Sequence, residues 1–241
     1  MKNILIPTTF EEDTLTAVKT AVKYATGKNC AIVLLQLQKM SDSYSSLSVL
    51  RESKPLYTAA QNEIISKCRE TAEQSGNCRL VLHNQCGISA PLLKNLIEYL
   101  GTDLVIFTPS YKEDKNVLNS YCTQLLLNSK CPILHLGLTE NEHDFNKALF
   151  LESEQTTLNI SQLQQIINGQ FNFKIVSQAK VAEEHNPADF APLLSETILK
   201  NNIDLLVETR KSEKRKTKKK AAKNVNESLG LPVLSIYEGA L

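Results

Sequence analysis

The residues with the clearest chemical meaning lie in "FTPSYKEDKNVLNS", Phe107 to Ser120, which joins an apolar run to a segment with helical spacing. In a protein that alternates strands and helices, such a connection is where a phosphate is commonly bound. Glycines usually build that kind of loop, because they let the backbone come close to the ligand. This stretch contains no glycine. It is therefore either an altered phosphate loop or a plain connection.

A second chemical feature is the basic run "RKSEKRKTKKKAAK" at 210–223, which carries nine Lys or Arg against one acid. Its local charge of +8 leaves about −7 on the rest of a chain whose net charge is +1. Concentrated positive charge of this kind can bind a polyanion, with an affinity that falls steeply with salt. The polyanion candidates are Lys214, Arg215, Lys216, Lys218, Lys219 and Lys220.

The alternative interpretation of the basic run is a solvated segment that keeps the protein in solution, which is the commoner role of such runs. No aromatic residue lies among its lysines, so stacking on single-stranded nucleic acid is not indicated. Nucleic acid is thus a less favoured partner that the sequence leaves open.

Other candidate chemistry is sparse. His83 and Cys86 form an H-x-x-C pair with Cys78 nearby, but a zinc site needs about four ligands and no second pair has suitable spacing. Neither G-x-S-x-G nor G-x-x-x-x-G-K-[ST] occurs, and no nucleophile with a base can be assembled. The sequence therefore predicts no metal, no cofactor and no catalytic site.

The elements that would position these residues alternate along the chain. Runs that are apolar throughout predict strands at 3–7, 31–37, 79–83, 103–107 and 132–136. Helical spacing follows the first strand and covers 55–74, 90–100 and 115–129, with a Ser-rich loop at 39–48. Apolar strands linked by helices favour an α/β fold with a parallel sheet covered on both faces.

The second part of the chain repeats the first. "LLKNLIEYLGTDLVIFT" (92–108) aligns without gaps to "LLSETILKNNIDLLVET" (193–209), and "CPILHL" (131–136) to "LPVLSI" (231–236), at offsets of 101 and 100. Two blocks at nearly constant offset indicate an internal duplication. The second copy is shorter, with a first strand at 148–152. We predict domains at 1–138 and 146–241, separated near the polar "TENEHDFN" (139–146).

The order "KNILIPTTFEEDTLTAVKTAVKYA", "GTDLVIFT" and "NSYCTQLLLNSKCPILHL" resembles the universal stress protein family in its tandem form. The resemblance covers 1–137 and, more faintly, 147–237. It implies two doubly wound parallel-sheet domains with strand order 3-2-1-4-5, the second one shorter. It also implies that the two domains pair through their last strands, and it leaves open a homodimer.

Some members of that family bind ATP through a loop that reads G-x2-G-x9-G-[ST], with a carboxylate after the first strand. In this chain only the serine matches, the spacing is x7, and Thr9 replaces the acid. We therefore expect that ATP binding in this mode is lost. The vestigial positions of the nucleotide site are Thr8, Thr9, Thr108, Tyr111, Asn119 and Ser120.

Three functions follow from these observations. The favoured one is a stress-response interaction or scaffold module that acts on a protein partner. The alternatives are binding of another small ligand in the crevice near Thr8, Thr9, Leu37 and Thr108, and polyanion binding through 210–223. No apolar run approaches the roughly 18 residues of a membrane span. Six cysteines without a C-x-x-C pair favour reduced thiols and a cytoplasmic location.

Overall fold

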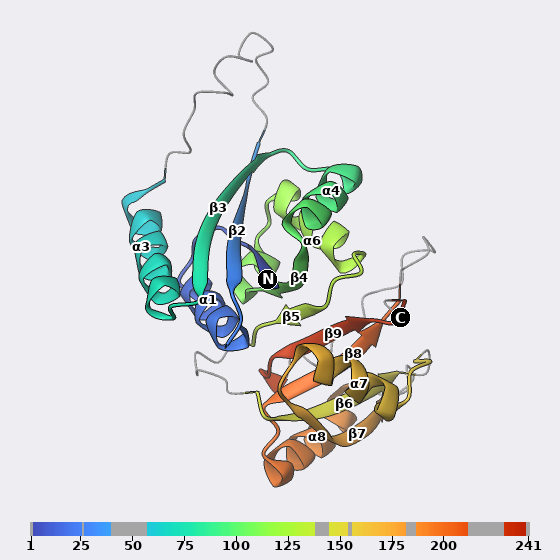
Figure 1. Cartoon of the computed structure of the whole chain (residues 1–241). Coiled ribbons are helices and arrows are strands. Elements are labelled where there is room, and N and C mark those ends of the chain that lie inside the picture. The colour runs from blue at the N-terminus through green and yellow to red at the C-terminus, as the bar shows by residue number, and fades with distance from the viewer. Residues whose placement is uncertain are drawn as a thin grey trace. The chain divides into compact units, whose positions relative to one another are not determined.

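The structure is a computed structural model that describes residues 2–25, 27–39, 57–137, 145–153, 156–181, 187–211 and 229–239. Its contacts divide the chain into two compact units, Met1–Leu127 and Asn128–Leu241 (Figure 1). Both units alternate strands and helices, which confirms the predicted α/β class. The division precedes the predicted boundary, so the short strand at 133–135 is grouped with the second unit.

Four parallel strands form the sheet of the first unit: β1 (Lys2–Pro7), β2 (Cys30–Gln38), β3 (Cys78–Cys86) and β4 (Thr102–Phe107). Their order is β3-β2-β1-β4, which agrees with the first four strands of the predicted order. Ile4 of β1 is in register with Ile32 of β2 and Leu104 of β4, and all three are fully buried. The continuous apolar runs thus become central strands that are covered on both faces.

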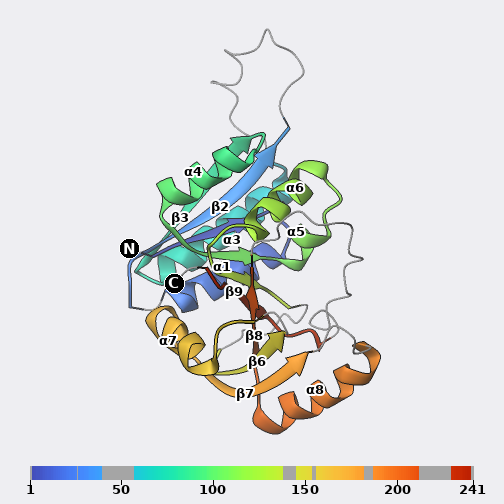
Figure 2. The same ribbon diagram turned by 90° about the vertical axis from the view of Figure 1, so that its right-hand side faces the viewer.

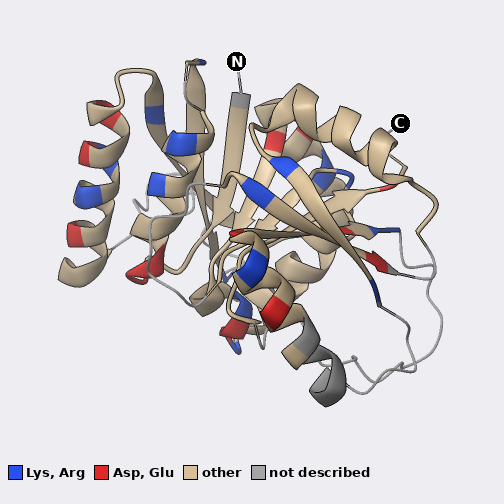
Figure 3. Cartoon of the chain, turned by 90° about the horizontal axis from the view of Figure 1, so that it is seen from below, with Lys and Arg blue, Asp and Glu red and all other residues tan. Residues whose placement is uncertain are grey.

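Helices cover both faces of this sheet. α1 (Asp13–Tyr24) and α3 (Ala59–Gln74) pack together on one side, while α4 (Ala90–Leu100) and α6 (Val117–Leu127) lie on the other (Figure 1). Side-chain caps begin α3 and α4, where the Thr58 and Ser89 hydroxyls accept backbone N–H bonds. Acidic and basic residues both lie along α3, the helix at the left of Figure 3.

The predicted helix at 115–129 is shorter than expected, and a separate five-residue helix, α5 (Pro109–Glu113), precedes it. Thr108 caps α5 through its hydroxyl, and Pro109 stands in the first turn, where its missing N–H costs little. The glycine-free stretch is therefore partly helical rather than an open loop.

The second unit contains β5 (Ile133–His135), β6 (Lys147–Ser153), α7 (Ile160–Gln170), β7 (Lys174–Val181), α8 (Pro187–Asn201), β8 (Leu205–Arg210) and β9 (Val233–Tyr237). Its strand order is β5-β9-β8-β6-β7. β5 and β9 are antiparallel, with Leu134 opposite Leu234, and the other pairs are parallel. Within the described residues, only β7 lies between β6 and β8 along the chain, whereas β2 and β3 both lie between β1 and β4. The described part of the second unit thus has one strand fewer at this place.

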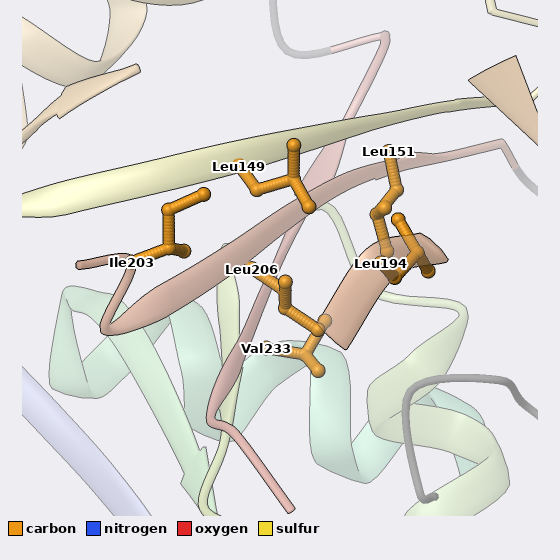
Figure 4. Close-up of a cluster of buried hydrophobic side chains, with 6 residues drawn as sticks. All are labelled: Leu149, Leu151, Leu194, Ile203, Leu206 and Val233. Carbon is orange, nitrogen blue, oxygen red and sulfur yellow. The ribbon is translucent and has the colours of Figure 1, made fainter. Parts of the chain in front are cut away.

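The core of the second unit lies on both faces of its parallel strands. Figure 2 shows α7 and α8 on opposite sides of β6, β7 and β8. On the α8 side, six buried side chains pack in one cluster (Figure 4): Leu149, Leu151, Leu194, Ile203, Leu206 and Val233. The alternate strand residues face α7, whose buried residues are Leu163 and Ile167. Each strand thus supplies apolar side chains to both layers, as buried parallel strands do.

One backbone arrangement recurs in the two units. In the first, the Asn3 N–H donates to the Asp103 carboxylate at 3.0 Å. In the second, the Lys147 N–H donates to the Asp204 carboxylate at 3.0 Å, and the Asn146 N–H to its other oxygen at 2.9 Å. The two aspartates are 101 residues apart, the offset of the aligned sequence blocks.

The side chains at these strand starts also make equivalent contacts. The Asn3 amide donates to the Leu100 carbonyl, and the Lys147 ammonium donates to the Asn201 carbonyl at 3.4 Å. The two carbonyls are again 101 residues apart. Asn3 and Lys147 therefore occupy matching places at the starts of β1 and β6.

Candidate functional site

The six vestigial positions lie where β1 and β4, which are neighbouring parallel strands, reach their carboxyl ends, and at the helices that follow β4. Thr8, Thr108, Tyr111 and Asn119 are buried, Thr9 is half-buried and Ser120 is exposed. The structure therefore brings the predicted residues to one edge of the sheet. Most of them are turned into the protein rather than toward solvent.

Thr8 is engaged entirely within the unit. Its hydroxyl accepts the Phe10 N–H at 2.7 Å and shares a hydrogen bond with the Thr14 hydroxyl at 2.8 Å. Its own N–H donates to the Leu35 carbonyl of β2 at 2.9 Å. The side chain thus joins the end of β1 to the first turn of α1. Because its hydroxyl is already engaged in two hydrogen bonds, it has little hydrogen-bonding capacity left for a ligand.

Thr9 stands where a nucleotide-binding member of the resembled family carries an acid, and its contact here is with α3. Its carbonyl accepts the Gln61 side-chain amide at 3.2 Å. The next residue, Phe10, has a φ of 63°, which is uncommon for a residue with a bulky side chain. Phe10 is 2% exposed and meets the Tyr57 ring edge to face at 5.3 Å. A buried ring therefore follows Thr9 at this edge.

Thr108 organises the start of α5. Its hydroxyl accepts the Tyr111 N–H at 3.3 Å and shares a hydrogen bond with the Ser110 hydroxyl at 3.2 Å. The Thr108 carbonyl accepts the Lys112 N–H at 3.2 Å, which closes the helical turn. The position aligned with the first glycine of a nucleotide loop therefore works as a helix cap.

Asp13, the first residue of α1, is the strongest polar partner of this segment. Its carboxylate accepts the Ser110 N–H at 2.8 Å on one oxygen and the Ser110 hydroxyl at 2.6 Å on the other. Hydrogen bonds to an ionised acceptor are about twice as strong as neutral ones. A carboxylate of the chain itself therefore occupies the backbone and hydroxyl donors of Ser110, which an anion bound after β4 would otherwise meet.

Sequence reasoning missed both members of this pair, because neither matches a position of the expected loop. The contact spans 97 residues, and nothing in the local pattern of either residue signals it. The available signal was that an acid begins the helix after β1 while a serine follows β4.

Tyr111 fills the interior beneath α5. It is 1% exposed, and its ring stacks on Phe107 with centroids 6.1 Å apart and an interplanar angle of 23°. Its hydroxyl is 3.5 Å from the Asn119 side-chain oxygen. Burial, together with the nearby Cys122 thiol, raises the pKa of Tyr111 far above its ordinary value. Tyr111 is thus a core residue, and its bulk lies where a nucleotide loop would carry glycine.

Asn119 and Ser120 begin α6 rather than face a ligand. The Asn119 amide donates to the Asp114 carboxylate at 2.6 Å. The Ser120 hydroxyl donates to the Asp114 carbonyl at 3.3 Å. The one residue that matches the nucleotide motif therefore holds the turn between α5 and α6.

The matching edge of the second unit also contains a carboxylate. Thr209 aligns with Thr108, and its hydroxyl donates to Glu238 at 2.8 Å. The Thr157 hydroxyl and N–H donate to the same carboxylate at 2.7 Å and 3.2 Å, and the Lys211 ammonium lies 3.2 Å away. Glu238 lies just after β9 and was not a sequence candidate.

The basic candidates Lys214, Arg215, Lys216, Lys218, Lys219 and Lys220 lie outside the described residues. Arg210, the first basic residue of the run, belongs to β8 and points inward. Its guanidinium donates to the Ser129 and Cys131 carbonyls and lies 5.7 Å from the centre of the Tyr237 ring. Burial lowers the pKa of Arg210 to about 10. It is therefore a structural residue of the second unit.

Two further findings hold for the described part of the chain alone. It contains no group of three or more His, Cys, Asp or Glu residues that could hold a metal ion. None of the helices found there is both long enough and apolar enough to cross a membrane.

Comparisons with known proteins agree with this fold. A universal stress protein from Archaeoglobus fulgidus DSM 4304 superposes with a TM-score of 0.57 at 12% identity, covering 98% of this chain and 96% of that one. A putative universal stress protein from Pseudomonas aeruginosa UCBPP-PA14 gives a TM-score of 0.53 at 13% identity, with coverages of 98% and 93%. No protein-family profile and no curated protein sequence matches the chain. The chain therefore has the fold of universal stress proteins.

Proposed function

We propose that this universal stress protein-like chain does not bind ATP through the segment after β4, and that it acts in the stress response as an interaction or scaffold module without catalytic activity or cofactor. The observation that carries the proposal is the contact between Asp13 and Ser110, at 2.8 Å and 2.6 Å. A phosphate approaching Ser110 would meet a carboxylate that already holds its donors, and like charges repel.

The buried residues around this contact add support. Tyr111 is packed against Phe107, and the Thr8 and Thr108 hydroxyls are engaged with neighbours in the same unit. These contacts also weigh against the alternative of another small ligand near Thr8 and Thr108. The polyanion alternative rests on the sequence of 210–223 alone, and it is tested separately by retention of the chain on heparin.

The proposal includes a tandem form, with domains at 1–138 and 146–241 that arose by duplication. The equivalent hydrogen bonds of Asp103 and Asp204 support it, since they combine the sequence offset with the same local geometry. The antiparallel pairing of β5 with β9 supports pairing through last strands. The proposal also includes a cytoplasmic location and a protein partner, and it leaves open whether the chain forms a homodimer.

Equilibrium dialysis of the purified chain with labelled ATP tests the central claim. We expect no saturable binding at micromolar ATP, in the presence or absence of Mg²⁺, while an ATP-binding universal stress protein measured in parallel retains the nucleotide. The Asp13→Ala variant is measured beside the wild-type chain, because this substitution frees the Ser110 donors but leaves Tyr111 in place.

Saturable micromolar binding by the wild-type chain would overturn the proposal. Binding gained by the Asp13→Ala variant alone would instead identify the carboxylate as the single obstacle to ATP. Failure of both to bind is the expected result, because the buried Tyr111 also stands where a glycine is needed.

A further inference from the structure

The carboxylate of Glu238 accepts hydrogen bonds from three donors and lies beside a cation. Both of its oxygens accept hydrogen bonds: Oε1 from the Thr209 hydroxyl at 2.8 Å, and Oε2 from the Thr157 hydroxyl at 2.7 Å. The Thr157 N–H approaches the two oxygens at 3.2 Å and 3.4 Å. The Lys211 ammonium lies 3.2 Å from Oε2. Two hydroxyls, one N–H and one cation thus surround one anion.

The donors and the carboxylate come from three parts of the second unit: the segment before α7, the end of β8 and the end of β9. Thr157 precedes α7, Thr209 lies in β8, Lys211 follows β8, and Glu238 follows β9. The Thr156 hydroxyl, 3.1 Å from the Thr209 hydroxyl, adds a polar group beside them. A convergence of donors from different elements on one point is the arrangement of a binding site rather than of a local cap.

The position of Glu238 is fixed by the backbone. Its N–H donates to the Arg210 carbonyl at 3.0 Å, which extends the pairing of β9 with β8 by one residue. Its side chain is 5% exposed, whereas that of Lys211 is 45% exposed. The carboxylate is therefore buried among the donors, and the lysine forms the side of the group that faces solvent.

We propose that Thr157, Thr209 and Lys211 form an oxyanion-binding site in the second unit, which Glu238 fills with its own carboxylate. Without that side chain, the site takes a free oxyanion, a carboxylate or a phosphate group, at the same donors. The donors are hydroxyls and an ammonium, which bind either group. This inference does not rest on the absence of ATP binding, because it concerns other residues and another ligand class.

Removing Glu238 leaves a cation and three donors without their acceptor, which destabilises the unit. A ligand that binds only the folded state raises its stability, and well above the dissociation constant the gain grows with the logarithm of the ligand concentration. The experiment is therefore chemical rescue. The melting temperature of the full-length Glu238→Ala variant is measured in sodium acetate, sodium phosphate and sodium chloride at equal ionic strength.

We expect acetate or phosphate to raise the melting temperature of Glu238→Ala by about 2–4 °C over chloride. Phosphate stabilises folded proteins in general, so the wild-type chain and the surface control Glu98→Ala, whose site is filled, give the general effect of each salt, which the shift of Glu238→Ala should exceed. A larger response to acetate assigns the site to carboxylates, and a larger response to phosphate assigns it to phosphate groups. The double variant Glu238→Ala with Lys211→Gln should lose most of the rescue.

Equal responses of Glu238→Ala to all three salts would overturn the inference, as would full rescue of the double variant. If Glu238→Ala does not fold, Glu238→Ser serves in the same measurement, because its short polar side chain leaves the donors accessible. ATP dialysis uses the wild-type chain and phosphate rescue uses the variant, so failure of one proposal is distinguishable from failure of the other.

Discussion

Asp103 and Asp204 accept hydrogen bonds from the backbone at the starts of β1 and β6, and they do so at the same place in the two units. Asp103, within β4, holds the start of β1, and Asp204, just before β8, holds the start of β6. Because the offset between them equals that of the aligned sequence blocks, local geometry and sequence give the same correspondence.

The first prediction concerns these two aspartates. Replacement of either by alanine leaves strand N–H groups without their acceptor. We expect a loss of about 1–3 kcal/mol of unfolding free energy for Asp103, whose bond is partly buried, and about 0.5–1.5 kcal/mol for Asp204, whose bonds are exposed. Urea denaturation, followed by circular dichroism, measures the loss. Glu98→Ala is the control, because its exposed pair with Lys94 at 3.8 Å should contribute less than about 1 kcal/mol. Wild-type stability in both aspartate variants would contradict the prediction.

The second prediction concerns the contact between Asp13 and Ser110. We expect Asp13→Ala to destabilise the chain by about 1–3 kcal/mol, since two charge-assisted hydrogen bonds are lost. Glu12→Ala, at the exposed neighbouring position, should change stability by less than about 0.5 kcal/mol. A double-mutant cycle with Ser110→Ala isolates the side-chain part of the coupling. A coupling energy near zero would show that the contact contributes nothing.

The third prediction concerns Tyr111. Tyr111→Ala removes a buried ring and should cost about 3–5 kcal/mol, as other buried aromatic truncations do. Tyr111→Phe keeps the ring and loses the hydroxyl contacts with Asn119, which is 3.5 Å away, and with the Cys122 thiol, so its cost should stay below about 1.5 kcal/mol. Guanidinium denaturation of the two variants compares these losses. Similar costs for both would mean that the hydroxyl, not the ring, holds the segment.

The fourth prediction concerns pH. Burial disfavours the charged form of Glu238, but hydrogen bonds from Thr157, Thr209 and Lys211 outweigh it and hold the pKa of Glu238 below its usual value. A lowered pKa stabilises the folded state above the unfolded pKa of about 4.3, and this stabilisation is lost as the pH falls through the folded value.

The stability difference between wild type and Glu238→Gln should therefore be constant above about pH 5 and should shrink on acidification below about pH 4. Unfolding free energies measured at several pH values check this. A difference that grows toward low pH would reverse the sign of the linkage and contradict the assignment.

The fifth prediction concerns the basic run. If 210–223 binds polyanions, the wild-type chain should be retained on heparin at low salt, and retention should fall steeply as salt rises. Replacing Lys218, Lys219 and Lys220 by glutamine should weaken retention and reduce its dependence on salt. Absence of wild-type retention at low salt would remove the polyanion alternative.

The sequence predicted the parallel strands well, because apolar runs that are buried on both faces leave an unmistakable pattern. The run at 103–107 becomes β4 at Thr102–Phe107, and the run at 3–7 becomes β1 at Lys2–Pro7. The helix start at α5 was missed, although Thr108 and Pro109 carry the signal of a cap and a first turn. The expected binding loop obscured that local signal.

The polar contacts of the candidate site could not be predicted in the same way. Asp13 meets Ser110 across 97 residues, and Thr157 meets Glu238 across 81. Each residue type is ordinary at its own position, and only the folding of distant strands to one edge brings the pairs together. Sequence alignment predicted the positions of Thr108 and Tyr111, but their roles as cap and core residue depend on these long-range contacts.

The strand β7 has β6 as its neighbour, and within the described residues no strand pairs with its other edge. Its counterpart β2 lies between two strands and is nearly all apolar, whereas β7 exposes Lys174, Val176, Gln178 and Lys180 along one face. Charged side chains on an open edge hinder pairing with strands of other molecules. The lysines at the two ends of β7 therefore work against the addition of a strand from a second molecule at the place where the sheet of this unit ends.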